Sequence, residues 1–267
     1  MLAIIFQTIK SKKISLISYS LGALLFLWMF VSMFPSIQEQ SEKFAEVFSS
    51  YPEQFFSIFN IEELQFDTLE KFLAIEHYSI LWPILALFLM VSIAGVGLSG
   101  EIEKGTMSLV LARPVSRLKI FAARYIAGLM MLVIFTLFSV FAVIPLSALH
   151  NVDYSLESQL AVSLLGFLFG WAVFSLAYMF SAVFSEKSKT YMLMGGVLVG
   201  MYALNIAANL KENWEDLNFF TFFHYFNYNK ALLDAGIGRD TLFVFIATIV
   251  ISTVCGALIF HKRDIAI

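Results

Sequence analysis

Residues 14–34 read ISLISYSLGALLFLWMFVSMF, an apolar stretch without a charged side chain that follows Lys10, Lys12 and Lys13. An α-helix rises about 1.5 Å per residue, so this stretch can cross a hydrocarbon layer about 30 Å thick. A secretory signal peptide has a shorter apolar run and a small-residue cleavage site, and the stretch has neither feature. We therefore expect a retained signal-anchor helix that spans a membrane.

Five further apolar runs follow along the chain, and Arg124 is the one charged residue within them. The composition agrees with them, because 60% of the 267 residues are hydrophobic and 14% are charged, with a mean hydropathy of +0.82. Soluble domains are about half apolar and about a quarter charged. The sequence predicts one all-α, polytopic integral membrane domain over residues 1–267, with six transmembrane helices near 14–34, 80–100, 120–149, 159–184, 190–210 and 241–260.

The basic residues predict the orientation of these spans. Cytoplasmic loops of membrane proteins are enriched in Lys and Arg. With a cytoplasmic N-terminus most of the 17 basic residues lie inside, and six spans return the C-terminus to the cytoplasm. The residues outside would then be Lys43, Lys71, Lys211, Lys230 and Arg239.

Two external segments separate spans in this topology. Segment 35–79 is acidic, and Phe66, Leu69, Phe72 and Leu73 recur in it at helical spacing. Segment 211–240 carries many aromatic residues but is too polar to span the membrane. We expect short amphipathic helices in the first segment, and a re-entrant hairpin or an interfacial aromatic belt in the second.

The internal loop between the second and third spans, 100–117, reads GEIEKGTMSLVLARPVSR. It opens with charge and glycine, offers Thr106 as a helix N-cap, and continues with apolar residues up to Pro114. A short helix with one apolar face and flanking charges can dock into a groove on a partner. The residues alone leave a generic positive-inside loop as an equal alternative.

This loop resembles that of the type-2 ABC-transporter (ABC-2 type) permease family, which reads approximately Glu-x-x-x-Gly-Thr-Leu-x-x-Leu-Leu-x-x-Pro-Val-Ser-Arg, with a basic residue at the head of the next span. Met107 stands where the family has Leu, Arg124 takes the basic position, and Glu101 or Glu103 supplies the acid. The resemblance implies a coupling helix that docks on a separate ATPase subunit. The docking residues would be Glu101, Glu103, Gly105, Thr106, Leu109, Val110, Arg113, Pro114 and Arg117.

The resemblance also implies the partners. We expect two copies of an ABC ATPase, a second permease copy or a related permease, and membrane lipid, with no nucleic acid. The chain lacks a Gly-x-x-x-x-Gly-Lys-Ser/Thr phosphate loop, so ATP and Mg²⁺ are expected on the partner ATPase and no cofactor in this chain. Its four histidines are distributed over both sides of the predicted membrane, and we expect no metal site.

The fifth span carries small residues on one stripe, at Gly196, Gly200, Ala203 and Ala207. Such stripes allow helices to pack closely, within one chain or across a dimer. Asn205 and Asn209 lie on the other side. They are candidates for lining a polar pathway, or for hydrogen bonding to a neighbouring helix.

The sequence thus predicts a plasma-membrane permease subunit of an ATP-driven exporter, and not an enzyme. A second hypothesis is a mechanotransmitting subunit that acts on an external partner, through segment 35–79, without transporting solute. A third, an intramembrane enzyme, is disfavoured because the spans lack an acid or metal ligand at depth. The transported substrate cannot be read from the sequence.

Overall fold

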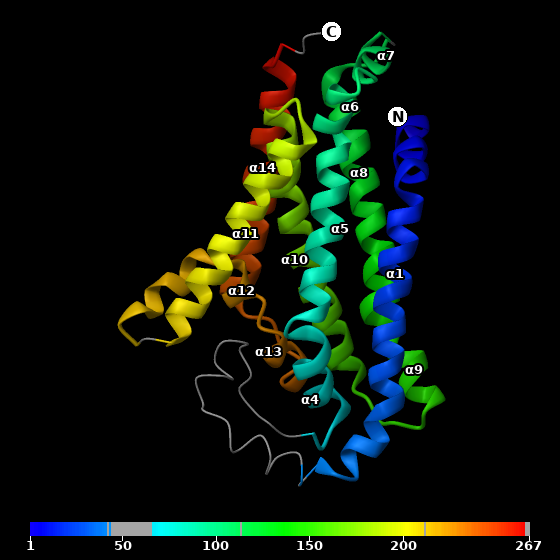
Figure 1. Cartoon of the computed structure of the whole chain (residues 1–267), viewed down its shortest axis with the longest axis vertical. Coiled ribbons are helices and arrows are strands. Elements are labelled where there is room, and N and C mark those ends of the chain that lie inside the picture. The colour runs from blue at the N-terminus through cyan, green and yellow to red at the C-terminus, as the bar shows by residue number, and fades with distance from the viewer. Residues whose placement is uncertain (42, 44–65, 113, 211, 265–267) are drawn as a thin grey trace.

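The computed structural model describes residues 1–41, 43, 66–112, 114–210 and 212–264, and all of the regular secondary structure in these residues is helical. Segment 44–65, which is most of the first predicted external segment, lies outside them. The partner surface predicted there is therefore not described. The helices run along the length of one bundle, with both termini at the same end (Figure 1).

The first helix, α1, covers Leu2–Gln38 and contains the predicted span 14–34. Its buried residues recur every three or four positions, at Leu16, Ser20, Ala23, Leu27, Val31 and Phe34. This spacing places them on one face of a helix. Many of the other apolar side chains of α1, such as Leu21 and Leu25, are exposed. The helix therefore presents one face to the bundle and the other to lipid.

The second crossing begins earlier than the predicted boundary at residue 80. Helix α4 (Leu69–Leu73) continues into the π-helical turn η1 (Ala74–Tyr78), and α5 (Leu81–Gly97) follows at a bend of 46°. Leu69, Phe72 and Leu73 are buried, which confirms the helical spacing recognised in the sequence. The charged side chains at Glu70, Lys71 and Glu76 concealed this extension in a search for uncharged runs.

The third crossing contains a π-helical turn just before Pro145. Helix α8 (Arg117–Thr136) is followed by the π-helical turn η2 (Leu137–Phe141) and α9 (Val143–Leu149). Proline has no backbone N–H and its ring clashes with the carbonyl group four residues earlier, which here belongs to Phe141 in η2. Pro145 lies within α9, four residues after this turn, and the crossing Arg117–Leu149 continues through it.

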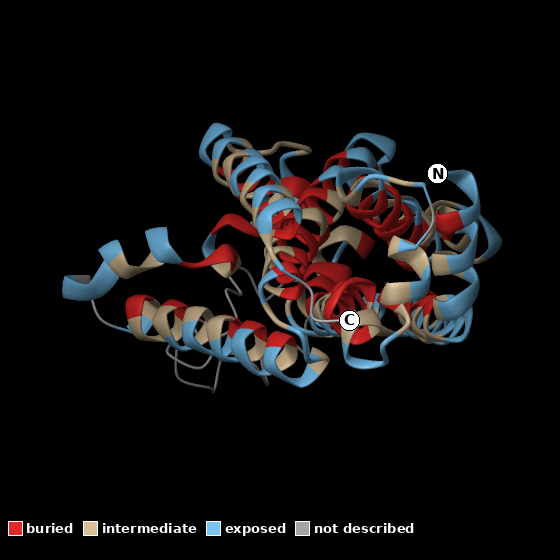
Figure 2. Cartoon of the chain, turned by 90° about the horizontal axis from the view of Figure 1, so that it is seen from above, coloured by how far each residue is buried: buried red, intermediate tan, exposed pale blue. Residues whose placement is uncertain are grey.

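Helix α10 (Leu156–Val183) is the centre of the bundle. In its most apolar 18-residue stretch 67% of the residues are buried, and it packs against α5, α8, α13 and α14. Gly166 allows this approach, because a Cβ atom there would meet the indole ring of Trp82. Figure 2 shows the buried residues gathered in the middle of the bundle and the exposed ones round its rim.

The last two crossings are α11 (Lys187–Leu210) and α14 (Arg239–Lys262). Between them lie η3 (Glu212–Phe220), α12 (Phe222–Tyr225) and α13 (Tyr228–Leu233). The aromatic residues here divide into two groups. Phe226 stacks on Trp82 in the core, with 5.6 Å between ring centroids, whereas Phe219 and Phe220 are exposed. The re-entrant hairpin and the interfacial aromatic belt both stay predictions for this segment.

Five single helices are long and apolar enough to cross a membrane, and the bent pair of α4–η1 and α5 provides a sixth. Both termini lie at one end, which requires an even number of crossings (Figure 1). The six predicted spans therefore agree with the structure. We call the end with both termini and α7 (Met107–Leu111) the α7 end, and the opposite one the α4 end.

Candidate functional site

The predicted docking segment 100–117 forms a compact projection at the α7 end (Figure 1). It consists of α6 (Ser99–Glu103) and α7, joined by a turn at Gly105. Gly105 has a φ of 70°, in the left-handed region that only glycine adopts readily. Its N–H donates to the carbonyl oxygen of Ile102 over 2.9 Å. The turn reverses the chain so that α7 lies at the tip of the projection.

Glu101 connects this projection to the third crossing. Its carboxylate is 3.2 Å from the guanidinium of Arg124 on α8, and accepts a hydrogen bond of 2.8 Å from the Thr106 hydroxyl. Arg124 is buried and also donates to the Gly97 carbonyl at the end of α5. Thr106 precedes α7 as predicted, but its hydroxyl binds Glu101 instead of capping the helix.

The other predicted acid, Glu103, contacts a different helix. Its carboxylate accepts a hydrogen bond of 2.9 Å from the backbone N–H of Lys187, the first residue of α11. A second connection lies at the start of α6, where the Ser99 hydroxyl is 3.0 Å from that of Thr190 on α11. Ser181 of α10 accepts the Ser99 N–H over 2.9 Å. The projection is therefore attached to α8, α10 and α11 together.

Arg117 ends the projection and contacts the C-terminal segment. Its guanidinium donates to the backbone carbonyl of Arg263. Arg263 donates in turn to the carbonyl oxygens of Ala182 and Phe184, each over 2.9 Å, at the end of α10. A cation is favourable at a helix C-terminus, where carbonyl groups lack helical partners. Burial lowers the pKa of Arg263, but a guanidinium stays charged in proteins.

Apolar side chains divide the α7 helix into an anchored and a free face. Met107 is buried, Val110 is half-buried, and Leu109 is 70% exposed at the tip. Pro114 is exposed as well, and Arg113 lies outside the described residues. An exposed leucine among charged residues at the end of a membrane bundle fits a groove on a partner.

The small-residue stripe on α11 makes no close contact inside this chain. A Cβ atom at Gly196 or Gly200 would meet nothing within 4 Å, and Ala203 is exposed and Ala207 half-buried. Close packing within the chain, one of the two predicted roles, is therefore wrong for both glycines. The helix leans away from the others along most of its length (Figure 1). The dimer contact stays a prediction.

Asn205 and Asn209 bind the segment that follows α11. The Asn205 side-chain oxygen accepts a hydrogen bond of 3.4 Å from Thr221, and that of Asn209 accepts one of 3.2 Å from Asn218. These contacts fit the predicted bonding to a neighbouring element and fold η3 back along α11. The pathway-lining role stays a prediction for both residues.

Sequence reasoning missed the roles of Ser99, Ser181, Thr190 and Arg263. All four sit at the α7 end and make contacts about 80 residues or more away in sequence, which no local spacing reveals. Arg263 is the only charged residue of the four, and its local sequence does not identify a partner.

Comparison with known families gives one match that covers nearly the whole chain. A sequence model described as ABC-2 family transporter protein matches residues 6–265. Among curated proteins, none matches the chain at a significant level. The match includes the projection, all six crossings and the segment between α11 and α14.

Proposed function

The chain belongs to the ABC-2 family of transporter proteins, and we propose that it couples ATP hydrolysis on a separate ATPase subunit to export of a substrate. Its family makes it a permease membrane subunit of an ABC transporter, located in the cell membrane as a multi-pass protein. In the proposal, the α7 end faces the cytoplasm, where the ATPase and its ATP and Mg²⁺ are found.

The observation that carries the proposal is the exposure of Leu109 on an anchored projection. A leucine in water gains about 1.5–3 kcal/mol when it is buried, so an exposed one at this position favours a partner. The charged residues beside it, Lys104 and Lys119, are exposed and are available to steer association with an acidic groove. We infer that α7 sits in a cleft of the ATPase.

The contacts of the projection support the transmission of movement. Glu101, Glu103 and Ser99 attach it to α8, α10 and α11, and Arg117 attaches it to the tail after α14. A displacement of α7 by the ATPase would therefore move these helices together, as a rigid-body tilt. Helix α11 carries η3 along its half nearer the α4 end, through Asn205 and Asn209. Because 22% of its most apolar stretch is buried, against 67% for α10, α11 and η3 together would change their angle more easily than α10.

The assembly would contain two permease chains and two ATPase chains. The glycine stripe on α11 supports this arrangement, because it offers a surface that the chain itself leaves uncovered. A pathway between two permeases would open alternately to either side or outward only. We propose export as the direction.

Leu109→Asp tests the docking surface. A carboxylate buried without a partner costs about 3–5 kcal/mol, enough to weaken association at least about a hundredfold. Leu149→Asp is a matched control, because Leu149 is 69% exposed on α9 at the α4 end. The tagged chain is isolated from its own membranes, and co-purified ATPase subunit and ATP hydrolysis are measured. We expect both to be lost in Leu109→Asp and kept in Leu149→Asp. Equal retention in both variants would contradict the proposal.

A further inference from the structure

A cavity of about 500 Å³ lies beside the segment between α11 and α14, away from the projection. Its wall comes from η3, α12, α13, the start of α14 and one residue of α10, Leu165. None of the residues assigned to the coupling role lines it.

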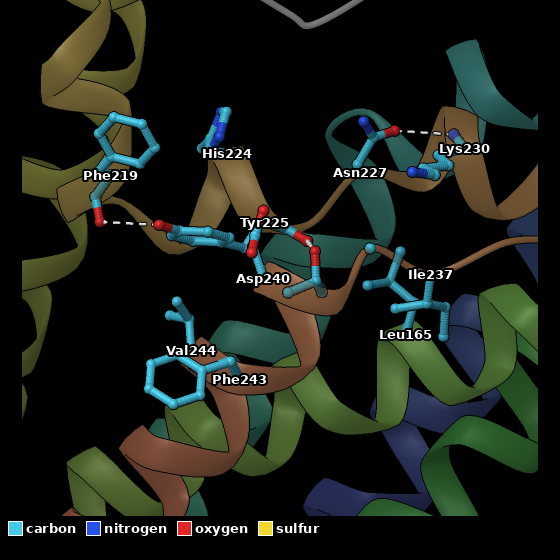
Figure 3. Close-up of a pocket in the computed structure, with 12 residues that line it drawn as sticks. Leu165, Phe219, His224, Tyr225, Asn227, Lys230, Ile237, Asp240, Phe243 and Val244 are labelled. Atoms are coloured by element: carbon cyan, nitrogen blue, oxygen red, sulfur yellow. Dashed lines mark hydrogen bonds between the residues drawn. The ribbon is translucent and has the colours of Figure 1, made fainter.

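The lining changes from polar to apolar across the cavity. Figure 3 shows His224, Asn227 and Lys230 along one side and Leu165, Phe243 and Val244 along the other. Asp240 and the ring of Tyr225 lie between these two groups (Figure 3). Such a gradient suits an amphiphile whose charged part meets the polar side.

Two opposite charges line this cavity without pairing to each other. Among the described residues, neither the Lys230 ammonium nor the Asp240 carboxylate has an ion pair within 4.0 Å or a side-chain hydrogen bond. Both side chains are exposed. Burial lowers the pKa of His224, so this imidazole is neutral at pH 7 and acts as a hydrogen-bonding group. One cation and one anion are therefore available to a ligand.

The backbone around these groups is held by hydrogen bonds. Asn227 accepts the Lys230 N–H over 2.8 Å and so caps α13. Thr241 donates to the Tyr225 carbonyl over 3.2 Å, which ties α12 to the first turn of α14. The backbone at Lys230 and near Asp240 is thus held before any ligand binds.

The neighbouring surface places the cavity at the membrane interface. Phe219 and Phe243 line the cavity and are exposed, and aromatic residues concentrate at the level of lipid headgroups. The exposed side of α14 beyond Phe243 continues with Ile246, Val250 and Val254, which face lipid. An acyl chain leaving the cavity would find an apolar surface there.

We propose that this cavity binds the headgroup of a zwitterionic phospholipid, with its phosphate on Lys230 and its ammonium on Asp240. His224 and Asn227 would complete the phosphate contacts, and the acyl chains would follow α14. This assignment does not rest on the coupling role, since it concerns the opposite part of the chain. The cavity's place in the outer leaflet rests on the proposed orientation, with the α7 end in the cytoplasm.

Lipid retention measured by native mass spectrometry tests the proposal. The purified chain is exchanged into detergent with equal amounts of phosphatidylethanolamine and phosphatidylglycerol that carry identical acyl chains. We expect the zwitterionic lipid to be retained preferentially. Lys230→Gln and Asp240→Asn should each reduce its retention about tenfold or more, because each removes one charge-assisted hydrogen bond.

Arg239→Gln and Asp234→Asn are matched controls, since both residues are exposed, charged and adjacent to the cavity without lining it. They should retain lipid like the parent.

A loss of lipid retention in Lys230→Gln without a loss in Asp240→Asn would contradict the binding of a zwitterionic headgroup. It would indicate a site for an anion alone. Preferential retention of phosphatidylglycerol by the parent chain would by itself contradict the proposal. If soluble glycerophosphoethanolamine displaced the bound lipid as well as intact phosphatidylethanolamine does, the ligand would be a free headgroup and not a lipid. Because no ATPase is present, a failed coupling proposal leaves these outcomes unchanged.

Discussion

At the scale of single residues, the two acids of the docking segment show what spacing can and cannot predict. The sequence indicated that Glu101 or Glu103 provides the acidic contact, and the structure uses both for different purposes. Two residues apart on a helix, their side chains point about 200° apart. Their partners, Arg124 and Lys187, are 23 and 84 positions away, which is why the sequence left the choice open.

Arg124 should hold the projection by its charge and by its geometry. In Arg124→Gln, Glu101 loses its ion pair and the Gly97 carbonyl its donor, so we expect a stability loss of about 3 kcal/mol. Arg124→Lys should recover only part of this loss, because an ammonium cannot reproduce the forked geometry. Thermal unfolding of the purified chain measures both. Lys119→Gln, an exposed position on the same helix, should melt like the parent. An unchanged melting temperature in Arg124→Gln would show that the pair contributes nothing.

At the scale of helices, uninterrupted apolar length predicted the crossings well. Each predicted span lies on a helix whose bounds differ by a few residues, except where α1 and the second crossing extend further. Both extensions carry charged residues within helical turns. Lys10, Lys12 and Lys13 continue α1, and Glu70 and Lys71 lie on α4. Local composition alone does not separate such helical turns from loops.

The role of the α11 stripe could not be predicted from the chain alone. Small residues at helical spacing permit close approach, but they do not identify the helix that approaches. Inside this chain 22% of the most apolar stretch of α11 is buried, against 67% for α10. Tertiary packing therefore leaves α11 with an uncovered face.

Gly200→Leu should separate assembly from folding. Nothing within 4 Å opposes a side chain at Gly200, so the melting temperature of the monomer should stay unchanged while the dimer fraction falls. Gly128→Ala is the contrasting variant, because its Cβ would collide with the ring of Phe174 and should destabilise the monomer. Cross-linking in membranes and thermal unfolding measure the two effects. A full dimer fraction in Gly200→Leu would place the stripe against lipid.

At the scale of the whole molecule, the six crossings predict which residues face the outside. In a Cys255→Ala background, single cysteines at Ser41 and Glu157 should react with an impermeant thiol reagent added to intact cells. A cysteine at Ser188 should react only after the membrane is opened. Glu157 is exposed near the start of α10, whereas its neighbour Ser158 is buried and would be a poor probe. External labelling at Ser188 would invert the topology.

The long-range contacts of the α7 end decide whether the bundle moves as a unit. The sequence predicted the place of the docking segment through its motif, but not the attachment of that segment to four crossings. That attachment depends on side chains such as Ser99 and Arg263, whose partners are brought near only by the complete fold. The proposed coupling therefore depends on where the tip of this segment lies in the assembled transporter.

Photo-cross-linking from the tip tests this most directly. Cysteines introduced at Leu109 and, as a control, at Leu149 in a Cys255→Ala background are modified with a benzophenone reagent in isolated membranes and irradiated. We expect the cysteine that replaces Leu109 to form a conjugate between this chain and an ATP-hydrolysing subunit, and the cysteine that replaces Leu149 to form none. A conjugate from Leu149 alone, or none from Leu109 while the ATPase remains associated, would contradict this expectation.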